Sequence, residues 1–259
     1  MAALLSASML MSFAACGGNT NKGNDEDASK TLDYSNTDNS DATTNEDREV
    51  NIDKNIKVGD SVSFGYWNQT YQENGDDADE IIEWVVLEKQ GDKALVVSKY
   101  ALSSFAYMSD ESATPPITWE MSSVRKWLNG TFYEEAFSNN EKAIIETTTV
   151  TAAADPDYVT SIVLGNDTQD KVFLLSVDEV MKYFPTENDK LCQVTEVGEA
   201  RYAEYYGYVS DEGNCFWWTR SQSSSSWSAM AVTAWGDFQS NHSDTTDIAV
   251  RPAMWISIG

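Results

Sequence analysis

The tryptophans of this chain are confined to its later part. All nine lie between Trp67 and Trp255, in a sequence of 259 residues. Aromatic side chains bury more apolar surface than other residues, so the stretch that carries them is the one able to build a core. We therefore expect one globular domain over residues 57–259, which is an ordinary size for a domain.

Residues 17–56 have the opposite character. They are rich in Asn, Asp, Thr and Ser, and they contain almost no core-forming side chains. Such a segment cannot bury enough apolar surface to offset the conformational entropy that folding removes. We interpret it as a disordered tether, which its negative charge helps to extend.

Residues 1–16 read as an export signal. The stretch from Ala2 to Ala15 is uncharged and mostly apolar, but it is too short to span a bilayer comfortably. Its end, "FAAC", resembles the lipobox of bacterial lipoproteins. The resemblance implies that Cys16 carries a diacylglycerol and holds the protein at the outer face of a cell membrane, most simply in a Gram-positive bacterium. The alternative is a cleaved secretory signal in which Cys16 has no role.

The charge balance limits the partners of the chain. It has 42 Asp and Glu residues against 17 Lys and Arg residues, a formal net charge of −25. A field of this sign repels phosphate backbones, which argues against nucleic acid as a partner. It also opposes adsorption to anionic lipid headgroups, so we expect contact with the membrane through the lipid anchor only.

Strand patterns open the domain. Alternating β-prone residues predict a strand over 58–67. Two runs rich in Val, Leu and Ile within 80–102 flank Gly91-Asp92, a pair that favours a tight reversal, and they predict a hairpin. The apolar run at 170–176, "DKVFLLS", predicts a strand buried on both faces.

Helical periodicity follows Trp119. Apolar residues recur at i, i+3, i+4 and i+8 from Val124, with Ser122 or Ser123 as N-cap and with Gly130 weakening the middle. Further helices are predicted at the capping-box pairs Ser138/Glu141 and Ser176/Glu179, and over 198–207.

The C-terminal part from Cys215 onward returns to strand patterns. Trp217 and Trp218 lie next to each other and point to opposite faces of a strand. Arg220 and Arg251 read as structural pairing or stacking groups rather than as ligand contacts. Pro252 indicates an edge or a break in the ladder. The class is therefore α+β, with strands at both ends and helices in the middle.

An ordered series of blocks between Val58 and Ile258 resembles a bacterial domain family of unknown function. The blocks are "EWVVL", "SSVRKWLN", "DKVFLLS", "CFWWTRSQ" and "VRPAMW". The family is loosely similar to the C-type lectin-like fold shared by formylglycine-generating enzymes and by the variable proteins of diversity-generating retroelements. The resemblance implies a mixed, mostly antiparallel sheet with paired terminal strands, two to four short helices, and a late β-region that carries the ligand surface.

The segment 222–247 is the expected recognition surface. It is made of Ser, Thr, Asp, Asn and Gln with interspersed tryptophans, and it holds little to bury. Aromatic rings offer rigid contact area and stack on sugars, while short polar side chains adapt their hydrogen bonds. The alternative is that this segment forms ordinary solvated hairpin loops without a binding role. We expect an extracellular glycan or protein ligand to contact the following residues: Trp227, Trp235, Gln239, Asn241 and His242.

Catalysis is the less favoured interpretation. The chain has one histidine, His242, in a polar loop, and it contains no G-x-S-x-G motif. The alternative function is a cell-envelope enzyme acting on polysaccharide or peptidoglycan. It requires a pocket with two carboxylates, or an Asp or Glu beside His242. A purely structural envelope module would show neither a binding surface nor such a pocket.

Cys192 and Cys215 are the cysteines that remain once Cys16 is lipidated. An even pair outside the cell favours a structural disulfide, with two free thiols and a redox role as alternatives. One histidine and two distant cysteines do not suit zinc. Acidic turns at 166–170, 211–212 and 244–247 could supply oxygen ligands for calcium, but polar turns explain them more simply. We expect no cofactor.

Overall fold

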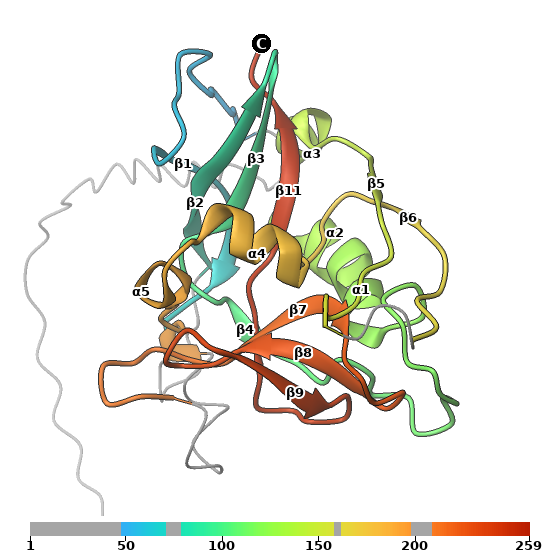
Figure 1. Cartoon of the computed structure of the whole chain (residues 1–259). Coiled ribbons are helices and arrows are strands. Elements are labelled where there is room, and N and C mark those ends of the chain that lie inside the picture. Colours follow the sequence, from blue (N-terminus) through green and yellow to red (C-terminus); the bar gives the residue numbers. More distant parts are fainter. Residues whose placement is uncertain (1–47, 71–78, 158–161, 198–208) are drawn as a thin grey trace, which may run out of the picture. The chain divides into compact units, whose positions relative to one another are not determined.

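The computed structural model describes residues 48–70, 79–157, 162–197 and 209–259, which belong to one compact unit (Figure 1). The expected export signal, most of the expected tether and the helix expected over 198–207 lie outside the described residues. None of the described helices is long and apolar enough to cross a bilayer.

The domain begins earlier than residue 57. Ile56 is buried in the core, and Val50 and Ile52 pack against that core. The Arg48 guanidinium donates to the Ala136 carbonyl oxygen at 3.0 Å and pairs with a Glu141 carboxylate oxygen at 2.9 Å. The end of the predicted tether is thus part of the folded unit, because its few apolar residues find a surface to cover.

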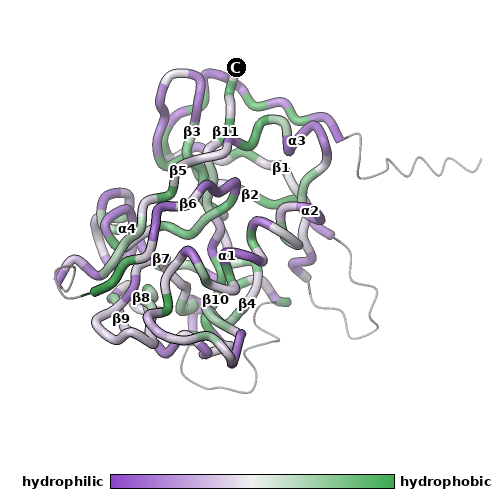
Figure 2. Tube along the Cα trace, turned by 90° about the vertical axis from the view of Figure 1, so that its right-hand side faces the viewer, coloured by the Kyte–Doolittle hydropathy of each residue, from purple (hydrophilic) through white to green (hydrophobic). Residues whose placement is uncertain are grey.

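The first sheet has the strand order β1-β2-β3-β11 and is antiparallel throughout. Its strands are β1 (Ser61–Asn68), β2 (Asp79–Gln90), β3 (Lys93–Ser98) and β11 (Ala253–Ser257). The predicted hairpin is β2–β3. Gly91 takes the left-handed conformation at its turn, with φ of 61°. Figure 2 shows the apolar character of this sheet against the more polar chain around β9.

The expected pairing of the terminal strands is wrong for the described chain. β1 pairs with β2 and β11 pairs with β3, so these two strands form opposite edges of the sheet. The β2–β3 hairpin stands between them, because its long apolar strands occupy the centre of the sheet.

A second, five-stranded sheet has the order β4-β10-β7-β8-β9. Its strands are β4 (Ser103–Ser104), β10 (Ala249–Val250), β7 (Trp217–Gln222), β8 (Ser228–Val232) and β9 (Phe238–His242). β10 and β7 run parallel, whereas the other pairs are antiparallel. A two-stranded ribbon joins β5 (Thr148–Val150) to β6 (Thr168–Asp170). The molecule is therefore α+β with mostly antiparallel sheets.

β10 and β11 are separated only by Arg251 and Pro252, yet they belong to different sheets. The proline is the break in the ladder that the sequence predicted. Its carbonyl oxygen accepts from the Ser98 N–H at 2.9 Å, and Arg251 Nε donates to the Ser98 carbonyl oxygen at 3.0 Å. Arg251 and Pro252 therefore bond to the end of β3 at the point where the chain passes from one sheet to the other (Figure 1).

The adjacent tryptophans of β7 are both fully buried. Trp217 Nε1 donates to the Lys190 carbonyl oxygen at 3.1 Å, and Trp218 Nε1 donates to the Phe105 carbonyl oxygen at 2.8 Å. Because successive strand residues face opposite ways, β7 must be covered on both faces. Each indole has a partner, as buried polar groups require.

The helical segment after Trp119 is α1 (Ser123–Trp127), a π-helical turn (Leu128–Phe132) and α2 (Tyr133–Ala136). The Ser122 hydroxyl accepts from the Arg125 N–H at 3.2 Å, which confirms the N-cap. Gly130 leaves the helical region, with φ of −113° and ψ of −105°. The glycine expected to weaken this helix is the point at which it is interrupted.

Both predicted capping boxes are present. Ser138 and Glu141 open α3 (Asn139–Ile144), and Ser176 and Glu179 open α4 (Val177–Tyr183). A further short helix, α5 (Glu187–Lys190), was not predicted, although Thr186 and Asp189 form a capping box at its start. In each case two orphan N–H groups gain local partners, which explains why these short helices form.

Residues 170–176 are buried as expected, but they do not form the predicted strand. Beyond the end of β6, only Phe173 bridges to Ala253. The Asn129 side chain replaces a strand partner: its Oδ1 accepts from the Lys171 N–H at 2.7 Å, and its Nδ2 donates to the Val172 carbonyl oxygen at 2.8 Å. Backbone groups that a side chain satisfies have no need of a ladder.

Candidate functional site

Trp227 and His242 meet at one end of the β8–β9 pair. Trp227 precedes β8 and His242 ends β9, where it lies opposite Ser228 in the antiparallel register. Their rings stack with centroids 6.3 Å apart and an interplanar angle of 8°. The Ser243 N–H donates to the Trp227 carbonyl oxygen at 2.9 Å, which holds the two segments together. Register alone therefore places two of the predicted ligand residues face to face.

These two rings line a cavity of about 510 Å³. Met108 and Ile117, both buried, supply apolar lining, while Asp110, Glu111 and Asp244 supply carboxylates. No Lys or Arg is among the described residues that line it. A half-exposed aromatic wall beside apolar and acidic groups suits a ligand that has one apolar face and several hydrogen-bond donors.

The polar groups of the cavity are only partly bound to one another. His242 Nδ1 lies 2.5 Å from Asp244 Oδ1, and both side chains are mostly exposed. Asp110 Oδ1 accepts from the Ser112 hydroxyl at 2.6 Å and from the Ser112 N–H at 2.9 Å. The hydroxyl bond first, and then the N–H bond, lower the pKa of Asp110 from its ordinary value. These bonds therefore favour the ionised carboxylate of Asp110.

The other predicted ligand residues lie elsewhere. Trp235 is 59% exposed, but it packs edge-on against Phe216 at 6.0 Å and does not line this cavity. Asn241 is buried, and its Nδ2 donates to the Gln239 carbonyl oxygen at 3.1 Å. Gln239 is exposed on β9, and its Nε2 donates to Asn241 Oδ1 at 3.3 Å. Trp227 and His242 thus line the same cavity, whereas Trp235, Asn241 and Gln239 do not line it.

The segment 222–247 is less exposed than its composition suggested. All of β8 is buried between β7 and β9, and Ser223, Ser243 and Asp247 are buried as well. Small residues such as Ser and Ala fit inside a sheet when neighbouring strands satisfy their backbone. The exposed part is reduced to short stretches, among them 224–227.

Sequence reasoning missed the wall of the cavity contributed by residues 106–117. This loop is distant in sequence from Trp227 and carries no recognisable motif. Two backbone bonds bring it to the site: the Met108 N–H donates to the Ser243 carbonyl oxygen at 2.7 Å, and the Ile117 N–H donates to the Ser226 carbonyl oxygen at 2.8 Å. Only the fold reveals this proximity.

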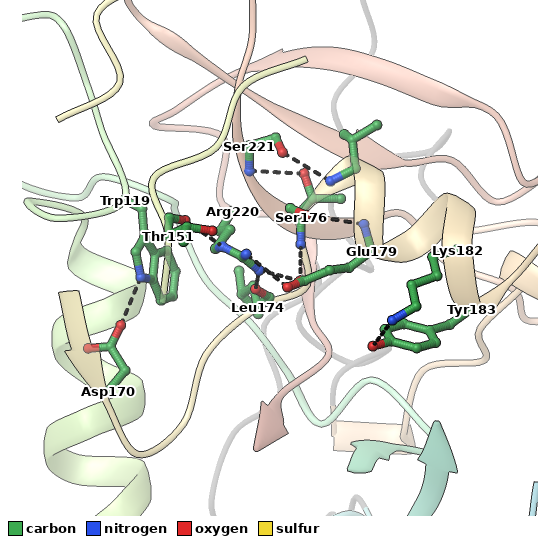
Figure 3. A network of polar contacts seen from close by, with 12 residues as sticks. Trp119, Thr151, Asp170, Leu174, Ser176, Glu179, Lys182, Tyr183, Arg220 and Ser221 are labelled. Atoms are coloured by element: carbon green, nitrogen blue, oxygen red, sulfur yellow. Dashed lines mark hydrogen bonds and ion pairs between the residues drawn. The ribbon is translucent and has the colours of Figure 1, made fainter. Parts of the chain in front are cut away.

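A second polar cluster surrounds Arg220 (Figure 3). The guanidinium makes a two-pronged ion pair with Glu179, in which Nη2 lies 2.9 Å from Oε1 and Nη1 contacts Oε2. It also donates to the carbonyl oxygens of Leu174 at 2.9 Å and Thr151 at 3.2 Å. The Tyr107 hydroxyl donates to the Arg220 carbonyl oxygen at 3.1 Å, and burial raises the pKa of that tyrosine. Arg220 is a structural pairing group, as expected.

Cys192 and Cys215 are free, buried thiols in this structure, in place of the bridge that the sequence favoured. The Cys215 N–H donates to the Cys192 carbonyl oxygen at 2.8 Å, and the side chains are close enough to hydrogen-bond. Burial acts to raise the pKa of the Cys192 thiol, but the Cys215 thiol and the charge of Arg251 outweigh it, so this pKa is lowered. Burial raises the pKa of the Cys215 thiol.

The candidate calcium ligands have other partners. Asp170 pairs with Arg125 at 2.8 Å, and Asp167 accepts from the Ala152 N–H at 2.9 Å. Among the described residues, no group of three or more His, Cys, Asp or Glu side chains is placed to hold a metal ion. Asp170 and Asp167 thus each contact another part of the folded chain.

Comparison with known proteins identifies a family by sequence. Residues 91–258 match the model of a family described as "Domain of unknown function (DUF6273)". No curated protein matches the chain. No solved structure matches it either.

Proposed function

Since the chain belongs to the DUF6273 family of domains of unknown function, we propose its function from its own surface: the domain binds an extracellular ligand, a glycan or a protein, without converting it. The observation that carries the proposal is the stacked pair of Trp227 and His242 on the wall of a cavity of about 510 Å³. An exposed aromatic pair of this kind has no core to fill and is a typical recognition element.

The chemistry of the cavity favours a glycan. The face of a pyranose ring is apolar and stacks on indole, whereas its hydroxyl groups donate hydrogen bonds to carboxylates. Trp227 supplies the ring, and Asp110, Glu111 and Asp244 supply acceptors around it. The absence of Lys and Arg from the described lining argues against an anionic ligand.

Replacing Trp227 with alanine is expected to weaken ligand binding about thirtyfold, corresponding to about 2 kcal/mol, because a central aromatic contact is lost. Ligands would be found on arrays of glycans and bacterial surface proteins, and affinities measured by isothermal titration calorimetry with the full chain. Trp235→Ala is the matched control, since Trp235 is also an exposed tryptophan but does not line the cavity. Equal losses in the two variants, or none in either, would contradict the proposed surface.

The domain is displayed at the cell surface in this proposal. Lipidation of Cys16 would provide a lasting anchor, since two or three acyl chains each add about 0.8 kcal/mol per buried methylene. The polar, acidic sequence of residues 17–47 supports a spacer that holds the cavity away from the membrane.

Growth with a clickable palmitate analogue is expected to label the protein, and Cys16→Ser is expected to abolish the label completely. Cys192→Ser serves as the control and should keep the label, because Cys192 is buried in the folded domain. A labelled Cys16→Ser protein, or an unlabelled parent protein, would remove the anchor from the proposal.

We further propose that the domain has a C-type lectin-like fold. Two features support it: β11 returns beside the early β2–β3 hairpin, and the late β7–β9 region carries the candidate ligand residues. A strand-by-strand superposition of an experimental structure on lectin-like domains would decide it, and a different connectivity of the β3–β11 core would reject it.

An enzyme acting on envelope polysaccharide is the second candidate, because Asp244 lies beside His242 at the cavity. An Asp on Nδ1 leaves Nε2 of the histidine free to act as a general base. The titration that tests binding also separates these functions. Shortened glycan recovered after incubation would select the enzyme, and intact glycan selects binding.

A further inference from the structure

The side-chain amide of Gln222 lacks the partners that a buried amide needs. Gln222 ends β7 and is 2% exposed. Its backbone is satisfied, since its N–H donates to the Ala153 carbonyl oxygen at 3.0 Å and its carbonyl oxygen accepts from the Asp155 N–H at 2.8 Å. Its Nε2 and Oε1 are both buried without a hydrogen bond. Unmade bonds of this kind are costly and uncommon, and they call for an explanation.

Gln222 lines a cavity of about 210 Å³ that is distinct from the Trp227 cavity. Its lining is apolar at Pro115, Pro116 and Val163, and polar at Ser224 and Ser226. Val163 is 66% exposed, so the apolar side of the cavity is open to solvent. A residue whose side-chain amide is buried and unpaired thus borders a cavity with an apolar wall.

This combination matches one functional group well. A secondary amide carries a carbonyl acceptor and an N–H donor, which can pair with Nε2 and Oε1 of a glutamine. An acetamido group adds a methyl, which suits the apolar side of the cavity. Its small size also suits a cavity that is narrower than the one at Trp227.

The two cavities are neighbours. Pro116 lines the smaller one and Ile117 the larger, and Ser226 lines the smaller one while Trp227 lines the larger. The Ile117 N–H donates to the Ser226 carbonyl oxygen at 2.8 Å, so a backbone hydrogen bond joins the two segments that line both cavities. We therefore expect a ligand longer than one sugar unit to reach both cavities.

We propose that the Gln222 cavity is a second subsite, which binds the acetamido group of an N-acetylated hexose in a glycan whose adjacent unit stacks on Trp227. The proposal rests on the ligand-binding function above and names the class of ligand. The aromatic pair in the adjoining cavity favours a glycan over a peptide, because the neighbouring unit presents a flat apolar ring face to it.

The test compares two neutral tetrasaccharides that differ in the acetamido group. The full chain is titrated with the β-1,4-linked tetramer of N-acetylglucosamine and with the β-1,4-linked tetramer of glucose. We expect the acetylated tetramer to bind more tightly by about tenfold or more, since every 1.4 kcal/mol is a factor of ten. In Gln222→Leu this preference should disappear, while the melting temperature stays the same or rises because an unsatisfied amide has been removed.

Gln239→Leu is the matched control, because Gln239 is an exposed glutamine that lines neither cavity. It should leave the preference intact. A marked fall in the melting temperature of Gln222→Leu with an unchanged preference would assign the amide a structural role and overturn the subsite.

Other outcomes separate the two proposals. Equal binding of the two tetramers, lost in Trp227→Ala, would overturn the acetamido subsite and leave the Trp227 surface in place. Failure of both tetramers to bind would also overturn the acetamido proposal. A peptide ligand whose binding depends on Gln222 would show that the amide recognises a peptide unit instead, which would reject the glycan assignment.

Discussion

Replacing Glu179 with alanine is expected to lower the free energy of unfolding by about 3 kcal/mol or more, because it leaves the Arg220 guanidinium buried without its counter-charge. The Arg220 side chain is 3% exposed, while Glu179 is 31% exposed, which limits the loss because water can approach the vacated position. The carbonyl oxygens of Leu174 and Thr151 remain as acceptors, but they carry no net charge. Guanidinium chloride unfolding followed by tryptophan fluorescence measures the loss.

The same substitution removes part of a helix cap. Glu179 Oε2 also accepts from the Ser176 N–H at 2.8 Å, so alanine breaks the capping box of α4. Glu179→Gln keeps an acceptor at this position and should be less destabilising than alanine. Glu134→Ala is the exposed control: the Glu134 side chain, which pairs with Lys142, is 65% exposed, and ion pairs at the surface contribute roughly 0–1 kcal/mol. Equal losses for Glu179→Ala and Glu134→Ala would mean that the Arg220 pair is not buried in solution.

Replacing Trp218 with alanine is expected to cost about 3–5 kcal/mol of stability, which is the usual range for deleting a buried tryptophan. The Trp218 side chain is fully buried, its ring packs edge-on against Tyr107 at 5.5 Å, and its N–H bonds to the Phe105 carbonyl oxygen. Alanine leaves both a cavity and an unpaired carbonyl oxygen. The measurement is again equilibrium unfolding in denaturant, with circular dichroism as the signal because an emitting residue is lost.

Trp227→Ala provides the contrast within the same sheet region. Trp227 is 45% exposed, so its removal should change stability by less than about 1 kcal/mol while it weakens ligand binding about thirtyfold. Trp218→Ala should lose stability but keep ligand binding at temperatures where the domain stays folded. If both variants lost the same stability, the division between the core tryptophan and the surface tryptophan would be wrong.

Local signals predicted the local structure of this protein. The capping boxes at Ser138 and Ser176, the Gly91 turn and the break at Pro252 all depend on residues within a few positions of one another. Each acts by satisfying a nearby N–H group or by permitting one backbone conformation, and these effects are nearly independent of the rest of the fold. The α+β class follows from the same patterns.

Long-range partners were not predictable in this way. The run 170–176 has the composition of a strand, but its backbone is satisfied by the side chain of Asn129, a residue on another element. The terminal strands do not pair, because the stability of a sheet depends on which strands compete for its centre. Composition reports that a segment is buried without reporting what covers it.

The candidate site was predicted only in part. Trp227 and His242 are brought together by the register of β8 and β9, whereas Asn241 turns inward and Trp235 lies at the opposite end of the strand pair. A shift of one residue along a strand reverses the face of a side chain, so composition cannot separate these residues. Asp110 and the Gln222 cavity depend on loops far away in sequence, and only the folded chain shows them.

The segment from Ala249 to Ser257 completes both sheets, through β10 in one and β11 in the other. In a chain growing from its N-terminus, the edges next to β3 and β7 therefore stay open until these residues have left the ribosome. We therefore expect the two sheets to be completed only after nearly the whole domain has been made.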